Sequence, residues 1–167
     1  GHLVFSTVHT NNAAGTFPRL IDLGVNPKII SSALNLAMAQ RLVRKLCIEC
    51  KKQVTLDGED KTIIEKILDS IKDKTYLEGI DSKNVYVAVG CDKCNMTGYK
   101  GRTGIHEAII MDEGIENILR ENPSEREIKK VTEKQNLLDL VQDGVIKILQ
   151  GITTLDELRR IVDIEKE

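Results

Sequence analysis

Several residue types are scarce in this chain of 167 residues, and their scarcity excludes some classes of function. It contains no tryptophan, and aromatic residues make up only 3% of the sequence. Base-stacking platforms and aromatic cages need several exposed rings, so neither is expected. The 24 basic and 26 acidic side chains nearly cancel, giving a net charge of −2. With a pI near 6.0, the chain is not expected to be a dedicated nucleic-acid binder.

Long apolar stretches are also lacking. No run approaches the roughly 18 apolar residues that predict a membrane-spanning helix. The first six residues have neither the basic region nor the long apolar region of a signal peptide. However, 41% of the residues are hydrophobic, which together with the low net charge predicts a folded domain rather than a disordered chain.

The chain begins with an apolar, β-prone run at 3–8, followed at once by the polar residues 9–12. Near-continuous apolarity predicts a strand that is covered on both faces, as in a parallel sheet. Ligands bind beyond the carboxyl ends of such strands, so residues 9–12 form a candidate binding edge. Alternatively, Asn11 or Asn12 only caps the next helix.

Two helices are expected next, over 13–23 and from 27 to about 45. Pro18 predicts a kink or a late start near Thr16 in the first helix, and Gly24 suits its end. Asn26 and Pro27 suit the start of the second helix.

The rest of the chain is predicted to be mixed. A helix is expected near 61–72, strands at 84–89 and from about 102 to 111, and helices in the last third. The helix starts are indicated by capping residues and one helix end by a glycine: Asp112, Ser124 with Glu127, Thr154 with Glu157, and Gly151.

All four cysteines lie in two Cys-x-x-Cys pairs, Cys47 with Cys50 and Cys91 with Cys94. Two such turns supply the four-sulfur tetrahedral set that Zn²⁺ favours, and a closed set of this kind is structural rather than catalytic. Disulfides, a redox pair and four unrelated core thiols are the alternatives. Gly90 and Gly98 are expected to give the second turn room to bend, and Lys45, Lys51, Lys52 and Lys93 to offset the charge of the metal centre.

Four motifs follow one another along the chain. They are Gly1-His2-Leu3-Val4-Phe5-Ser6-Thr7-Val8-His9-Thr10-Asn11, Arg19-Leu20-Ile21-Asp22-Leu23-Gly24-Val25 with Ala39-Gln40-Arg41-Leu42-Val43-Arg44-Lys45-Leu46-Cys47, the run from Gly90 to Glu107, and Gly151-Ile152-Thr153-Thr154-Leu155-Asp156-Glu157-Leu158. In this order they resemble motor ATPases of type II secretion and type IV pilus assembly, in the branch with a tetracysteine zinc element. The retraction ATPases of type IV pili lack the tetracysteine element.

The resemblance implies an α/β fold: the C-terminal portion of a RecA-like P-loop NTPase core, with a Cys₄ zinc-binding lobe and a C-terminal helical region. It divides the chain into the end of the ATPase core at 1–46, the tetracysteine lobe with a helical insert at 47–105, and the helical region at 106–167. It also implies a hexamer that hydrolyses ATP at the cytoplasmic face of the bacterial inner membrane, with a platform protein there as partner.

The same resemblance places His2 and His9 in a histidine box. His9 is expected near the γ-phosphate of ATP, and Thr10 and Asn11 are expected as supporting nucleotide-binding groups. For His2, an ordinary hydrogen-bonded strand histidine is the alternative, and His106 is expected to be structural.

The chain departs from this family in one respect: it has no Gly-Lys-Ser/Thr phosphate-binding loop. The acidic strand that would hold Mg²⁺ is also missing. In the family both precede the histidine box, so the chain is expected to be part of a longer ATPase and to be inactive alone, because phosphoryl transfer depends on those parts. The upstream N-terminal and Walker-motif regions are therefore expected partners.

A zinc-ribbon module that binds nucleic acid or a protein partner is the alternative function. Its footprint would be a basic cluster: Arg41, Arg44, Lys45, Lys51 and Lys52. The balanced charge and the scarcity of aromatic residues disfavour it.

Overall fold

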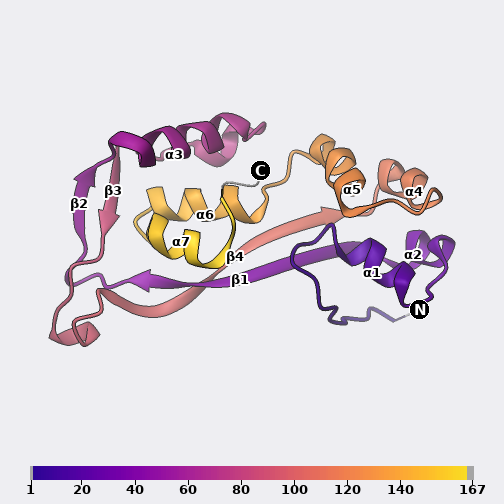
Figure 1. The fold of residues 1–167 in the computed structure, drawn as a ribbon, viewed down its shortest axis with the longest axis horizontal. Coiled ribbons are helices and arrows are strands. Elements are labelled where there is room, and N and C mark those ends of the chain that lie inside the picture. Colours follow the sequence, from indigo (N-terminus) through magenta and orange to yellow (C-terminus); the bar gives the residue numbers. More distant parts are fainter. Residues whose placement is uncertain (1, 165–167) are drawn as a thin grey trace. The chain divides into compact units, whose positions relative to one another are not determined.

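A computed structural model describes residues 2–164, which form two compact units. The first comprises the chain up to Ala39 and Glu107–Leu137, and the second comprises Gln40–His106 and the chain from Leu138 onward. Strands β1 (Leu36–Leu46) and β4 (Tyr99–Ile110) pair in a two-stranded sheet, and each contributes residues to both units (Figure 1). Within the described part of the chain, no helix has the length and apolarity needed to cross a bilayer.

The first unit is a cluster of short helices around a small core. Side-chain caps begin three of its four helices, at Asn26, Asp112 and Ser124. The Asn26 side chain accepts from the Lys28 N–H at 2.9 Å, and Ser124 and Glu127 form a reciprocal capping box. Phe17 and Ile128 are fully buried in its core. The helices are α1 (Thr16–Asp22), α2 (Pro27–Ala33), α4 (Glu113–Leu119) and α5 (Glu125–Thr132), followed by the 3-10 turn η3 (Glu133–Gln135).

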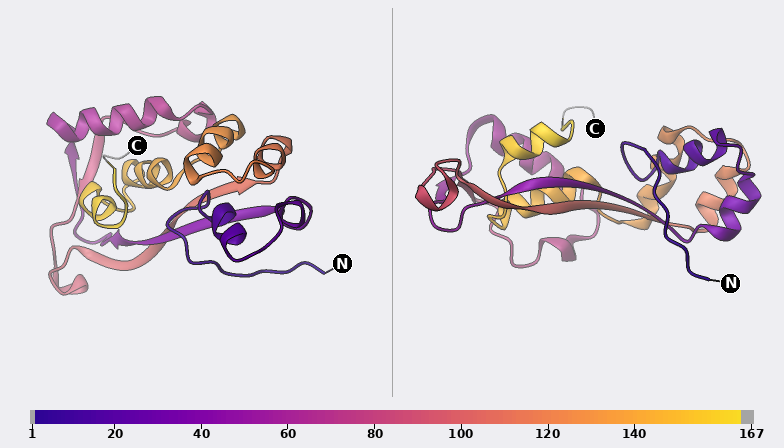
Figure 2. Two further views of the ribbon diagram at one scale, coloured as in Figure 1. Left: turned by 45° about the vertical axis from the view of Figure 1, so that its right-hand side comes forward. Right: turned by 90° about the horizontal axis from the view of Figure 1, so that it is seen from below.

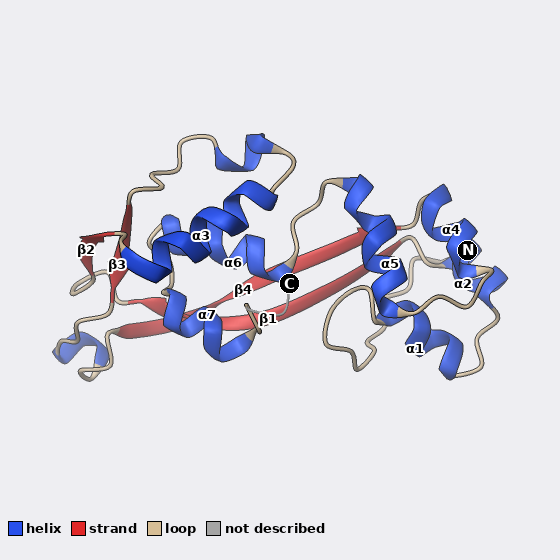
Figure 3. Cartoon of the chain, turned by 45° about the horizontal axis from the view of Figure 1, so that its top comes forward, coloured by secondary structure: helices blue, strands red, loops and turns tan. Residues whose placement is uncertain are grey.

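The second unit combines a two-stranded antiparallel sheet with three helices. Strand β2 (Lys52–Thr55) pairs antiparallel with β3 (Asn84–Val87), in a register that places Val54 opposite Val85. Helix α3 (Gly58–Ser70) and strand β3 both pack against helix α6 (Leu140–Leu149) (Figure 3). The remaining elements of the second unit are η1 (Lys74–Leu77), η2 (Asp92–Cys94) and α7 (Leu155–Ile161).

Side chains, rather than neighbouring strands, bond several backbone groups of β1 and β4. In the second unit, the His106 N–H donates to Asp143 Oδ2 at 2.8 Å and the Arg44 N–H to Glu157 Oε1 at 3.0 Å. In the first unit, the Gln135 amide bonds both backbone groups of Ile110, at 3.0 and 2.7 Å. These polar backbone groups are thus satisfied without a further strand.

Most sequence-predicted elements are confirmed. Helix α1 starts at Thr16 and ends before Gly24, whose φ of 85° and bond to the Ile21 carbonyl at 2.8 Å are those of a glycine C-cap. Helix α3, strands β3 and β4 and the capped starts of the later helices lie close to the predicted positions. Gly151, with a φ of 69°, follows the end of α6 as expected.

The helix predicted over 27–45 is wrong beyond residue 33, because the segment from Leu36 to Leu46 is strand β1. Its alanines, leucines, methionine and basic residues are good helix formers, so local propensity favours a helix. Pairing with β4 overrides that preference and buries Ala37, Val43 and Leu46.

The strand predicted at 3–8 is also absent. The structure shows this segment as an extended loop in which Leu3, Val4 and Phe5 are 77–89% exposed (Figure 2). A strand covered on both faces needs neighbours on each side, and no described residues pair with this one. Its apolar pattern is therefore unsatisfied within the part of the chain that the structure describes.

Candidate functional site

The two Cys-x-x-Cys pairs meet at one point in the second unit. The four Sγ atoms of Cys47, Cys50, Cys91 and Cys94 all lie within 4.8 Å of one another. The sulfur separations are 3.9 Å for Cys47–Cys91, 3.9 Å for Cys50–Cys94 and 3.8 Å for Cys91–Cys94. These four cysteines could therefore hold one metal ion.

The sulfur spacing distinguishes among the chemistries that were left open. A disulfide needs sulfurs about 2.05 Å apart, whereas all four cysteines here are free. A tetrahedral zinc ion with Zn–S distances of about 2.3 Å requires neighbouring sulfurs about 3.8 Å apart. The three separations given above are close to this value. Both Cys-x-x-Cys pairs contribute sulfurs to one cluster, which a single redox pair would not need.

Two glycines allow the second cysteine loop to close, as predicted. Gly90 has a φ of 110°, and a Cβ there would lie 2.6 Å from the Met96 carbonyl oxygen. Gly98 has a φ of 76°, and a Cβ there would lie 2.6 Å from the Ala88 Cβ. Both positions combine a left-handed backbone with close contact, so any side chain would open the loop.

The backbone also prepares the sulfurs for deprotonation. The N–H groups of Cys91 and Gly98 donate to the Cys94 Sγ at 3.3 and 3.2 Å. Burial opposes ionisation of Cys94, but these bonds outweigh it and lower its pKa to about 6. Burial raises the pKa of Cys50 to about 12, aided by its thiol neighbours. Without a cation, Cys94 therefore loses its proton far more readily than Cys50, and binding of a metal ion to the thiolates must release protons.

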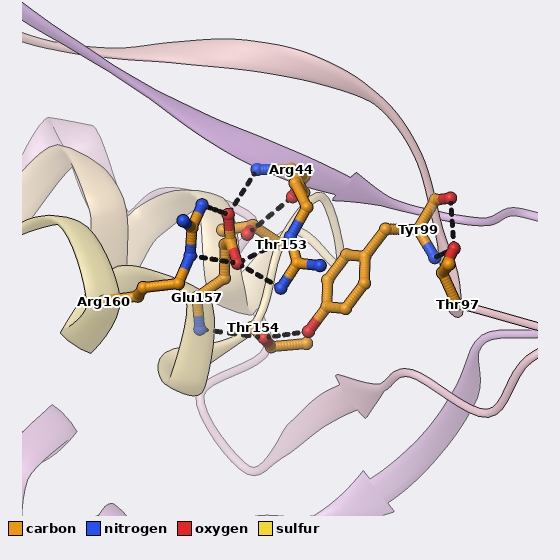
Figure 4. Close-up of polar contacts among 7 residues, drawn as sticks. All are labelled: Arg44, Thr97, Tyr99, Thr153, Thr154, Glu157 and Arg160. Atoms are coloured by element: carbon orange, nitrogen blue, oxygen red, sulfur yellow. Dashed lines mark hydrogen bonds and ion pairs between the residues drawn. The ribbon is translucent and has the colours of Figure 1, made fainter.

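Beside the cysteines, one buried carboxylate joins β1 to α7. The Glu157 side chain has no exposed surface, and it accepts from Arg44 Nε at 2.8 Å and from Arg160 Nη2 at 2.7 Å (Figure 4). Burial alone would raise the pKa of Glu157, but the bonds from Arg160 and Arg44 lower it to about 2. The sequence predicted Glu157 as the second half of a capping box, and its role in this ion pair was missed.

Tyr99 completes this cluster on the side of the second cysteine pair. Its hydroxyl lies 2.8 Å from the hydroxyl of Thr154, and the Arg44 guanidinium lies 4.2 Å from its ring centre (Figure 4). Arg160, three residues after Glu157, was a recognisable sequence signal. The partnership with Arg44 was not, since 113 residues separate Arg44 from Glu157.

The predicted nucleotide-contacting residues all lie in the loop before α1. His2, His9 and Asn11 are exposed, and the Thr10 hydroxyl donates to the Asn12 carbonyl at 2.9 Å. Asn12 accepts from the Gly15 N–H at 2.9 Å and so braces the turn that leads into α1. His2, His9, Thr10 and Asn11 remain predicted site residues, in the first unit, whereas the cysteines lie in the second.

Two residues of the predicted basic cluster, Arg44 and Lys51, bind other groups of the chain. Arg44 pairs with Glu157, and the Lys51 ammonium donates to the Gly151 carbonyl at 2.8 Å and lies 4.4 Å from the centre of the Tyr86 ring. These positive charges therefore stabilise the fold, which weakens the interpretation of the cluster as a nucleic-acid footprint.

Comparison with known proteins gives consistent matches along the chain. Residues 1–160 match the family described as Type II/IV secretion system protein. The chain is 40% identical over 161 residues to the type II secretion system ATPase E of Vibrio cholerae, which covers 96% of the chain and 30% of that protein. It is 40% identical over 158 residues to the type IV pilus assembly ATPase PilB of Thermus thermophilus, covering 95% of the chain and 17% of that protein. The PilB of Pseudomonas aeruginosa is 38% identical over 161 residues, covering 96% and 27%. The chain thus spans less than a third of the length of these relatives.

Proposed function

Because this chain belongs to the type II/IV secretion system protein family, we propose that it acts as the C-terminal segment of a motor ATPase. In this proposal the motor is a hexamer that couples ATP hydrolysis to type II protein secretion or to type IV pilus assembly. The similarity to ATPases of both systems supports it. The chain contains no phosphate-binding loop, so we expect hydrolysis only when it is joined to the Walker-motif regions of a longer protein.

The observation that carries the proposal for the second unit is the convergence of four sulfurs within 4.8 Å. We propose that Cys47, Cys50, Cys91 and Cys94 hold a structural Zn²⁺. Bound zinc would supply a cross-link between the two loops and charge compensation for four thiolates, with no open coordination position for catalysis. ATP and Mg²⁺ would be bound by the complete motor and not by the cysteine centre.

For the first unit we propose that His9 contacts the γ-phosphate, with His2 beside the nucleotide and Thr10 and Asn11 in support. The exposed apolar segment at 3–8 supports this role, because it has the composition of a buried strand. We propose that the segment pairs with strands of the RecA-like core outside this chain. That pairing would fix the loop from His9 to Asn11 at the end of a strand, where an imidazole can donate to phosphate.

The proposed motor also implies further protein partners. They are the other subunits of the hexamer and a platform protein at the cytoplasmic face of the bacterial inner membrane. Arg44 and Lys51 already bind Glu157 and the Gly151 carbonyl within the chain, which argues against nucleic acid as a partner.

A chimaera tests the motor assignment directly. The matching 161-residue segment of the Vibrio cholerae ATPase would be replaced by this chain, and steady-state ATP hydrolysis would be measured. We expect turnover in the chimaera, and we expect His9→Ala to lower kcat by about 10²-fold or more while changing KM for ATP little, since the contact is made in the transition state.

His106→Ala in the same chimaera serves as the matched control, because His106 lies on β4 and is expected to be structural. It should leave kcat close to that of the unmodified chimaera. Unchanged kcat in His9→Ala would refute the γ-phosphate contact. A folded, hexameric chimaera without ATP hydrolysis would refute the motor assignment.

A further inference from the structure

The turn formed by residues 151–154, which leads into α7, is held by both ends of the first cysteine loop. The Leu46 N–H donates to the Ile152 carbonyl at 2.8 Å, and Lys51 donates to the Gly151 carbonyl at 2.8 Å. Leu46 directly precedes Cys47, and Lys51 directly follows Cys50. Any opening of this Cys-x-x-Cys loop therefore moves two of the donors that hold the 151–154 turn.

The second cysteine loop reaches the same turn through hydroxyl groups. The Thr97 hydroxyl donates to the Cys94 carbonyl at 2.6 Å and accepts from the Tyr99 N–H at 3.3 Å. The Tyr99 hydroxyl then meets Thr154 at 2.8 Å, and Thr154 is the N-cap of α7 (Figure 4). A continuous path of bonds thus joins a metal-ligand residue to the first turn of the C-terminal helix.

A third set of contacts fixes α7 itself to the strand that leads into the first loop. The Arg44 carbonyl accepts from the Thr153 hydroxyl at 2.9 Å, and the Arg44 guanidinium lies between the Tyr99 ring and the buried Glu157 carboxylate. Arg44 is three residues before Cys47. The start of α7 is therefore held by residues on both sides of the first cysteine loop and by residues that follow the second.

We propose that metal binding by the four cysteines and docking of the 151–154 turn with α7 form one linked equilibrium, in which Tyr99 and Thr154 are positioning residues for the metal loops. The proposal rests on the metal centre proposed above. Linkage is reciprocal, so a docked α7 must tighten metal binding by the same factor by which metal binding favours docking. The C-terminal helix would thereby report to the rest of a motor whether the centre is loaded.

Zinc affinity measured by competition with a chromophoric chelator tests the proposal. Tyr99→Phe removes only the hydroxyl that meets Thr154, and Thr154→Val removes its partner. We expect each to weaken zinc binding by roughly fivefold or more. The double variant should weaken it little beyond Thr154→Val alone, because Thr154→Val, which also removes the cap on the Glu157 N–H, already breaks the bond that Tyr99→Phe removes. Tyr76→Phe, a matched change in η1, should bind zinc like the unmodified chain.

Hydrogen exchange of the unmodified chain supplies a second, independent measurement. Removing zinc with a chelator should speed exchange in residues 155–161 together with residues 90–99. Stoichiometric zinc binding with unchanged affinity in both variants and unchanged exchange in α7 would overturn the linkage and leave the metal centre standing. Failure of the unmodified chain to bind zinc would instead overturn the metal centre, and the linkage with it.

Discussion

At the scale of single residues, Glu157 is an acidic group held inside the protein by two ion pairs. It is fully buried, yet two guanidinium groups keep it charged, so its contribution depends on retaining both partners. An acidic residue on the surface is hydrated and depends much less on such partners. Its substitution is therefore expected to have a large and pH-dependent effect on stability.

Glu157→Gln is predicted to lower the free energy of unfolding by about 3 kcal/mol at pH 7, since its folded pKa of about 2 lies roughly two units below an ordinary glutamate. A folded pKa below the unfolded one stabilises the protein above the unfolded value. This stabilisation is lost as the pH falls from about 4.5 toward 2. The difference between the two proteins in urea unfolding should therefore shrink over that window.

Both proteins are compared without metal, so that release of the proposed zinc ion in acid does not contribute to the difference. Glu78→Gln, which removes one exposed negative charge, is the control and should change stability little at any pH. A Glu157→Gln effect of the same size at pH 7 and pH 2.5 would show that charge on Glu157 contributes nothing.

At the scale of elements, the contact between α6 and α7 depends on a missing side chain. Gly144 lies inside α6, where alanine would be favoured by helix propensity. However, a Cβ there would lie 2.4 Å from the Leu158 Cδ1, and Leu158 is fully buried. Close packing of the two helices therefore outweighs the intrinsic cost of glycine.

Gly144→Ala is accordingly predicted to destabilise the chain by about 1–3 kcal/mol in chemical unfolding, because the added methyl group would clash with the fully buried Leu158 side chain. The same substitution made in a Leu158→Ala background should be neutral or stabilising, since the clash is gone and the better helix former remains. Equal destabilisation in both backgrounds would contradict the packing explanation.

The elements also show how far sequence reasoning reached. Helix starts with a local chemical signal were predictable, as Ser124 with Glu127 illustrates. Strand β1 was not, because its helix-forming residues become a strand only through pairing with β4. In the candidate site, the cysteine cluster followed from spacing alone. The contact between Arg44 and Glu157 depends on tertiary folding and has no sequence signal at that separation.

At the scale of the whole molecule, the two units differ in what their cores require. The first unit has an apolar core around Phe17 and Ile128, which contains no cysteine. The second unit includes all four cysteines together with α6 and α7. Loss of metal is therefore expected to affect one unit much more than the other.

Elemental analysis is predicted to find about one zinc per chain. Cys91→Ser is predicted to reduce the zinc content and to speed hydrogen exchange in the second unit, whereas α4 and α5 stay protected. Ser124→Ala gives the converse: it should loosen α5 by about 1 kcal/mol and leave the zinc content at one. A folded chain that holds no zinc, or equal loss of protection in both units on Cys91→Ser, would contradict this division.

The side chains that bond the backbone of β1 and β4 have a consequence for how this protein behaves in concentrated solution. A long ribbon with open edges is a template on which other chains add strands and build fibrils. Asp143 takes the amide of His106, Glu157 takes that of Arg44, and Gln135 takes both groups of Ile110. Each of these side chains occupies a backbone group with which a strand of another chain could otherwise pair. Residues far away in the sequence thus protect the β1–β4 sheet against aggregation through its edges.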